Sequence, residues 1–339
     1  MDIKQLFADK EDINIVFLGG SITEGAHATK KELCYAGLTS AWLTEQLGGA
    51  GRVHCYNKGV GGTDSQYGLF RLARDVISKK PDLVFLEYAV NDGGRDMRLY
   101  MESIVRSLRE SCDPYIVFLY TTNEGYTTDT HYHAELAAHY GIPEISLKDA
   151  LKRALDGKNP HECGYFTDAV HPANPGHEVY FHEMVRCLSC PDYYKKAEKR
   201  PPLIAGSGAV RTEFISSASE RVTRVGEWET NTESPERPWA KSTAIGNRLR
   251  FSFEGTILGI EHGLHADSCM YEVWIDGSLT KTMHPVYGDM VSNQLVHDFA
   301  TIDLPHGRHE VEIVTVPSTN ERYTGSQTMI YNFIVGDRA

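Results

Sequence analysis

Residues 13–25 of the chain are INIVFLGGSITEG, a near-continuous apolar run that ends in two glycines and a serine. A short run of this kind, without regular alternation of polar residues, is typical of a strand buried on both faces of a parallel sheet. Gly19 and Gly20 then allow a tight turn, so that Ser21 comes at the carboxyl end of the predicted strand. The stretch therefore predicts an α/β fold with a polar side chain at the edge of the sheet where such folds bind ligands.

The same pattern of short apolar runs and longer amphipathic stretches continues to about residue 190. Further strands are predicted at Val53–Tyr56, Leu83–Tyr88, Tyr115–Tyr120 and, from a weaker pattern, Glu144–Leu147. Helical spacing occupies Leu33–Leu47, Gln66–Ser78, Arg98–Ser111, His131–His139, Ala150–Leu155 and Pro175–Leu188. Strands that alternate with helices indicate βαβ units and a parallel sheet.

The second part of the chain has a different pattern. Residues 191–207 are polar, basic and then rich in proline and glycine, which is typical of a surface linker. Short runs of β-forming residues follow, separated by turns such as Asp276-Gly277 and His306-Gly307. We therefore expect an α/β domain over 1–190, a linker over 191–207 and an all-β, jelly-roll-like sandwich over 208–339.

Composition narrows the class of protein. The 339 residues suit two domains, since domains usually have roughly 100–200 residues. The formal net charge of −12 argues against nucleic acid or an anionic membrane as the main partner. The seven cysteines are odd in number and scattered, no secretory signal pattern precedes the first strand, and no apolar stretch approaches about 18 residues. These features predict a cytoplasmic protein.

Two motifs follow the second and third predicted strands. Residues 57–63, NKGVGGT, form a glycine-rich loop whose amide groups can point at a negative charge, but the loop lacks the dinucleotide-binding and phosphate-binding patterns. Residues 89–94, AVNDGG, contain Asn91. Asn91 is predicted either to cap a helix or to direct its amide donor into the crevice. Asp92 is predicted to be structural, and Asp64 and Ser65 to begin a helix.

A last motif, Asp168-Ala169-Val170-His171-Pro172, lies just before the final predicted helix of this domain. Pro172 keeps His171 out of helical conformation, and the short spacing allows the Asp168 carboxylate to accept a hydrogen bond from His171 Nδ1. Asn174 is predicted as the N-cap of the following helix, with Pro175 at its first position.

The ordered set of serine, glycine, asparagine and Asp-x-x-His resembles the SGNH hydrolases, also called GDSL-like esterases, over residues 12–190. The resemblance implies a flavodoxin-like, three-layer α/β/α domain. It implies that Ser21, Asp168 and His171 are catalytic, and that Ser21, Gly62 and Asn91 form the oxyanion hole. Gly20 and Ala89 replace the aspartate and glycine that the family has at these positions, neither of which supplies a reacting group.

An SGNH domain followed by a jelly-roll-like module resembles the carbohydrate acetylesterases. The expected function is hydrolysis of small acyl esters, above all O-acetyl groups on oligosaccharides, by a Ser-His-Asp mechanism without metal or cofactor. Two alternatives remain open: a generic short-chain carboxylesterase or thioesterase without sugar preference, and a non-catalytic glycan-binding protein. The expected partner is the acyl ester substrate, and a homo-oligomer is left open.

Other residues with metal-binding or sugar-binding spacing are predicted to be structural. A zinc ribbon needs a second Cys pair, and the histidine pairs occur by chance in a histidine-rich chain. This group consists of Cys187 and Cys190, His131 and His133, and His262 and His265. The aromatic residues of the β part are expected mostly in the core, with Trp228 and Trp239 the more exposed pair.

Overall fold

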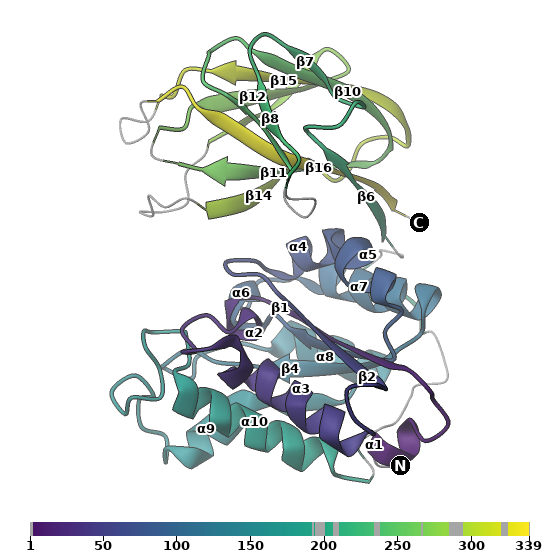
Figure 1. The fold of residues 1–339 in the computed structure, drawn as a ribbon, viewed down its shortest axis with the longest axis vertical. Helices are drawn as coiled ribbons and strands as arrows, with labels where there is room; N and C mark the ends of the chain where they lie inside the picture. The colour runs from purple at the N-terminus through teal and green to yellow at the C-terminus, as the bar shows by residue number, and fades with distance from the viewer. Residues whose placement is uncertain are drawn as a thin grey trace. The chain divides into compact units, whose positions relative to one another are not determined.

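The protein, described here from a computed structural model, divides into two units, Met1–Ala209 and Val210–Ala339 (Figure 1). The structure describes residues 3–191, 193, 201–205, 210–233, 238–265, 267–284, 294–319 and 325–338. Within these ranges, no helix has both the length and the apolar character needed to cross a membrane.

The first unit is built on a five-stranded sheet in the order β2-β1-β3-β4-β5, with every neighbouring pair parallel. This order is the flavodoxin-like one, in which ligands bind outside the carboxyl ends of the strands. The predicted parallel α/β fold is confirmed. The strands are β1 (Ile13–Gly19), β2 (Val53–Gly59), β3 (Leu83–Glu87), β4 (Tyr115–Tyr120) and β5 (Glu144–Ser146).

Helices cover both faces of this sheet, with α3, α9 and α10 on one face and α4 and α7 on the other (Figure 1). Alternate residues of β1 face the two layers, and Ile13, Ile15 and Phe17 belong to the core beneath α3 and α10. The helices are α1 (Ile3–Leu6), α2 (Ser21–Glu24), α3 (Tyr35–Gln46), α4 (Ser65–Phe70), α5 (Leu72–Asp75), α6 (Ala89–Asp92), α7 (Arg98–Ser111), α8 (His131–Tyr140), α9 (Leu147–Ala154) and α10 (Asn174–Leu188), with 3-10 turns at Lys31–Leu33 and Ile77–Lys79.

Two details of the predicted helices are wrong. The single helix expected over Gln66–Ser78 is interrupted at Arg71, whose fully buried guanidinium turns inward and donates to Gly19 O and Tyr88 Oη, each at 3.1 Å. Asn174 is not the N-cap of α10, since its side chain instead bonds the backbone N–H of Thr29 at 3.0 Å and its Oγ1 at 2.8 Å.

The second unit contains two antiparallel sheets, as predicted for this half of the chain, in the orders β13-β12-β15-β10-β7 and β14-β11-β16-β9-β8, with β6 paired to β16. A shared apolar core lies between them, where Phe251 of β10 stacks on Phe333 of β16 with ring centroids 4.2 Å apart. The strands are β6 (Val210–Ser216), β7 (Thr223–Val225), β8 (Glu229–Asn231), β9 (Trp239–Ser242), β10 (Arg248–Gly255), β11 (Ile257–Leu264), β12 (Met270–Ile275), β13 (Ser278–Met283), β14 (Gln294–Thr301), β15 (Gly307–Val316) and β16 (Thr328–Arg338).

The β unit contains strands that the apolar pattern did not predict, including the edge strands β7 and β8. Most of their residues are exposed or half-buried, so they carry little apolar signal. Asp276 and Gly277, both with positive φ, form the predicted two-residue turn between β12 and β13. Trp228 and Trp239 are half-buried, and Trp228 packs against the core.

Candidate active site

Ser21 lies at the carboxyl end of β1, which pairs with the edge strand β2 and with β3, where the chain turns directly into the short helix α2. It is the first residue of α2, and its side chain and backbone are only 8% exposed. The N–H groups of a first helical turn have no acceptor within the helix. The turn therefore brings a hydroxyl and an unused backbone donor to the same point.

His171 bridges Ser21 and Asp168. Its Nε2 lies 2.9 Å from Ser21 Oγ, and its Nδ1 lies 2.7 Å from Asp168 Oδ2. An ionised carboxylate only accepts hydrogen bonds, so Nδ1 carries the proton and Nε2 accepts from the serine hydroxyl. Asp168 Oδ1 also accepts from the N–H groups of Val170 and His171 at 2.8 and 2.7 Å. The structure thus joins three predicted site residues in one hydrogen-bonded chain.

The pKa of Asp168 follows from these bonds. Partial burial would raise it, but the hydrogen bonds from the His171 ring and from the backbone of Val170 and His171 outweigh this effect and lower the pKa to about 2. Asp168 is therefore ionised throughout the neutral range and can accept the hydrogen bond from His171 Nδ1.

The other two predicted residues, Gly62 and Asn91, lie on loops that meet Ser21. A Cβ at Gly20 would come within 2.7 Å of Asn91 Oδ1, so the absence of a side chain at Gly20 admits the asparagine. A Cβ at the neighbouring Gly61 would lie 3.8 Å from Ser21 Cβ, and Gly62 adopts the left-handed φ of 71° that favours glycine. Three loops from β1, β2 and β3 thus converge at the carboxyl edge of the sheet.

Asn91 does not cap a helix. It is the third residue of α6, whose N-cap is Tyr88, and the N-cap of α7 is Met97. Arg95 Nη2 donates to Asn91 O at 2.8 Å and bridges to Asp64 Oδ2 at 3.0 Å. The helix-cap interpretation of Asn91 is therefore wrong, and the role of its side-chain amide as a donor stays a prediction.

Asp92 and Asp64 are structural, as predicted. The buried Asp92 carboxylate accepts from the N–H of Ser65 at 3.0 Å and lies 2.7 Å from His133 Nε2. Asp64 is the N-cap of α4 and accepts from the N–H of Tyr67 at 3.3 Å. These contacts hold the second and third loops together beneath the site.

Glu87, which sequence reasoning missed, lies at the end of β3, below the turn that carries Ser21, and is 1% exposed. Its carboxylate accepts from Thr121 Oγ1 at 2.6 Å and Thr23 Oγ1 at 2.9 Å, and it also bonds the backbone of Gly20. Burial raises the pKa of Glu87 against these bonds. The sequence does contain a signal for Glu87, because it is a charged residue at the end of the otherwise apolar run LVFLE, residues 83–87.

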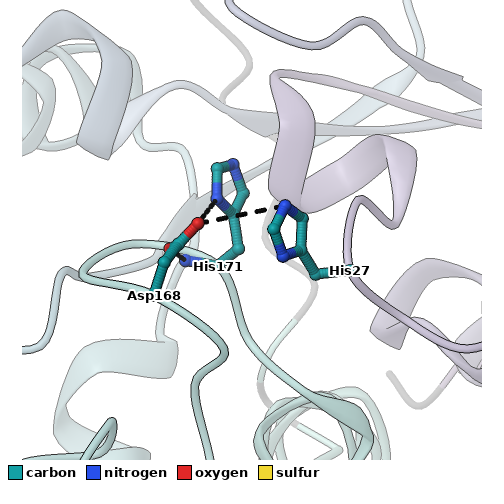
Figure 2. A group of neighbouring side chains, drawn as sticks. All are labelled: His27, Asp168 and His171. Atoms are coloured by element: carbon teal, nitrogen blue, oxygen red, sulfur yellow. Dashed lines mark hydrogen bonds and ion pairs between the residues drawn. The ribbon is translucent and has the colours of Figure 1, made fainter.

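His27 is the second residue that sequence reasoning missed. Figure 2 shows its ring beside Asp168 and His171. His27 Nε2 lies 3.9 Å from Asp168 Oδ2, and the imidazole rings of His27 and His171 stack with centroids 4.6 Å apart at an angle of 8°. No local pattern predicts this contact, because it joins residues that are far apart in the chain.

The cluster of His27, Asp168 and His171 is also the one group in the described ranges with three potential metal ligands close together. A metal ion binds an imidazole in the plane of the ring, at about 2.0–2.1 Å from the nitrogen for zinc. Two rings stacked almost in parallel cannot both direct a lone pair at one ion without turning. As placed, the cluster fits a hydrogen-bonded and stacked arrangement and does not fit a metal site.

Comparisons with known proteins agree with the sequence resemblance. Residues 17–179 match the model of the GDSL-like lipase/acylhydrolase family. A crystal structure of a two-domain esterase (CEX) active on acetylated mannans has a TM-score of 0.81 at 21% identity, over 98% of this chain and 93% of that chain. A second structure of that description, co-crystallised with mannopentaose, has a TM-score of 0.79 at 22% identity, over 98% and 92% of the two chains. The comparison with curated proteins found no match. The predicted resemblance and the two-part fold are confirmed.

Substituting Glu87→Gln should destabilise the first unit. Three donors converge on the carboxylate, whereas the amide of glutamine offers one acceptor oxygen and adds two donors. Leaving a buried donor without a partner costs about 1–3 kcal/mol, so we expect the free energy of unfolding, measured by urea titration, to fall by about that amount. Glu45→Gln, at an exposed position on α3, is the matched control. An unchanged unfolding midpoint in Glu87→Gln would contradict the supporting role of Glu87.

Proposed function

Because residues 17–179 belong to the GDSL-like lipase/acylhydrolase family, which makes the chain an SGNH-type carboxylic ester hydrolase, we propose that it removes small acyl groups, above all acetyl, from carbohydrates. The observation that carries the proposal is the hydrogen-bonded chain from Ser21 through His171 to Asp168. We propose these three residues as the catalytic triad, the first unit as the catalytic domain and the β unit as an accessory domain.

In the proposed first step, Ser21 Oγ attacks the ester carbonyl carbon while His171 Nε2 takes the serine proton. The hydrogen bond at 2.9 Å already aligns this transfer. The resulting imidazolium is stabilised by ionised Asp168, and it then gives its proton to the leaving alcohol oxygen as the carbon–oxygen bond breaks. The products of this step are the free alcohol and an acyl group on Ser21.

In the second step, a water molecule attacks the acyl carbon and gives a proton to His171 Nε2. The bond between the acyl carbon and Ser21 Oγ breaks, the serine regains its proton from His171, and the carboxylic acid leaves. In both steps the carbonyl oxygen becomes negative. The donors that we propose for it are the N–H groups of Ser21 and Gly62 and the side-chain amide of Asn91, on the three loops that converge there.

The carbohydrate part of the proposal is supported by the likeness of both units to an esterase described as active on acetylated mannans. The net charge of −12 is compatible with a neutral sugar ester and unfavourable for adsorption to anionic lipid surfaces. A small acyl group and a polar leaving group are therefore the substrate features that we propose.

Acetate release tests the substrate class. We expect the wild-type protein to release acetate from acetylated manno-oligosaccharides or xylo-oligosaccharides more efficiently, by kcat/KM, than from 4-nitrophenyl acetate, and Ser21→Ala to abolish both activities. Turnover of the aryl ester alone would contradict the sugar preference and favour a generic esterase. Covalent labelling by a fluorophosphonate that persists in Ser21→Ala would contradict the assignment of the nucleophile.

Asp168→Asn tests the orientation of His171. The asparagine amide can present a donor where the carboxylate accepts, so His171 would lose its proton at Nδ1 and carry it at Nε2, facing the serine hydroxyl. We expect kcat to fall by roughly 10³–10⁴ with little change in KM. Because the pKa of Asp168 is about 2, we expect Asp168 to stay ionised on acidification from pH 7 to pH 4. An Asp168→Asn enzyme with wild-type kcat would contradict the triad.

Asn91→Ala tests the oxyanion hole. Removing one donor to a developing oxyanion typically lowers the rate by about 10²–10³, with the ground state little affected. We expect that decrease in kcat for acetyl ester hydrolysis, with correct folding checked by circular dichroism. A decrease of less than about threefold would exclude Asn91 as a donor to the transition state.

A further inference from the structure

His27 lies next to the proposed triad, in the loop that follows the nucleophile helix α2. Its ring is parallel to that of His171, with an angle of 8° and a centroid separation of 4.6 Å (Figure 2). Offset stacks of aromatic rings fall in the range of about 4.5–7 Å, so the two imidazoles are in contact. His27 therefore covers one face of the ring that carries the proton in the proposed mechanism.

The backbone of His27 adopts a left-handed conformation, with a φ of 65°. This φ is uncommon for residues other than glycine, although histidine, like asparagine and aspartate, adopts it more often than most residues. Such conformations are unfavourable and persist when neighbouring contacts determine them, often at active sites. One such contact is visible, because His27 Nδ1 lies 2.7 Å from Thr167 Oγ1, and Thr167 in turn bonds His171 O through both its N–H and its hydroxyl, at 2.9 and 3.2 Å.

We propose that His27 is a positioning residue, which holds the plane of the His171 ring by stacking on it. The two nitrogens of His171 are held by Asp168 and by Ser21. Once Ser21 is acylated, its hydroxyl no longer donates to Nε2, and one of these two constraints is lost. The stack on His27 does not involve Ser21, so it still orients the ring when the water molecule must be activated.

This inference rests on the proposed function, since it assigns His27 a role in the same triad. His27 itself transfers no proton in it. Asp168 lies 2.7 Å from His171 Nδ1 and 3.9 Å from His27 Nε2, so the negative charge is placed closer to His171.

Two substitutions separate stacking from the other contacts of His27. His27→Phe keeps an aromatic ring attached to Cβ, as in histidine, but removes both ring nitrogens. His27→Asn removes the ring, keeps a side chain that can hydrogen bond Thr167, and tolerates the left-handed backbone better than histidine does. If His27 acts by stacking on His171, the His27→Phe enzyme should be active. If instead only the contact with Thr167 matters, the His27→Asn enzyme should be active. His182→Ala, at an exposed histidine of α10, is the control.

The readouts are the second-order rate of labelling by a fluorophosphonate and the kcat and KM for 4-nitrophenyl acetate, which test the triad whatever the natural ester is. We expect His27→Phe and His182→Ala to stay within about threefold of the wild type. We expect His27→Asn to lower the labelling rate and kcat roughly tenfold with KM unchanged, as slight misplacement of a catalytic group does.

The stacking role requires His27→Phe to react faster than His27→Asn, and any other order of the two rates overturns it. Wild-type rates in His27→Asn would show that the ring is dispensable, and equally slow variants would show that the nitrogens matter instead. A wild-type protein that neither reacts with the probe nor hydrolyses the ester would overturn the proposed function and this inference together. A reactive wild type with an unaffected His27→Asn variant would overturn the inference alone.

Discussion

The parallel pairing of β1 with β2 on one side and β3 on the other is the constraint on which the site depends. All three strands end at the same edge of the sheet, so the loops after them begin side by side. One loop brings Ser21, the second Gly62 and the third Asn91. None of these residues could be placed by its own loop alone, because each loop is short and takes its position from the strand before it.

Polar groups buried beneath the edge keep these loops in place. Glu87 connects the turn after β1 to Thr121 at the end of β4, and Asp92 connects the loop after β3 to the start of α4. Each carboxylate is buried and accepts from donors on more than one element. A buried carboxylate is stable only when such donors are present, so each carboxylate also specifies where those elements lie. These bonds therefore support the site from below, and above it His27 is exposed and Asp168 is half-buried.

The predicted strands of the first unit were located within a few residues, because near-continuous apolar runs bounded by glycine and polar residues have few other interpretations. The helix expected over Gln66–Ser78 is interrupted at Arg71, whose side chain bonds Gly19 and Tyr88, two residues that lie outside the predicted helix. The N-cap role predicted for Asn174 failed similarly, because Thr29, distant in the chain, offers its side chain better partners.

The sequence by itself determined the parallel α/β unit, the β-rich second unit and the candidate residues Ser21, Gly62, Asn91, Asp168 and His171, since strand patterns and the short Asp-x-x-His spacing are local. Only the tertiary structure decided that Ser21 meets His171, that Asn91 is no cap, that Glu87 lies beneath the turn after β1, and that His27 stacks on His171. These contacts join residues from separate strands and loops. They form because the strands end at the same edge of one sheet, and this pairing joins segments that are far apart in the sequence.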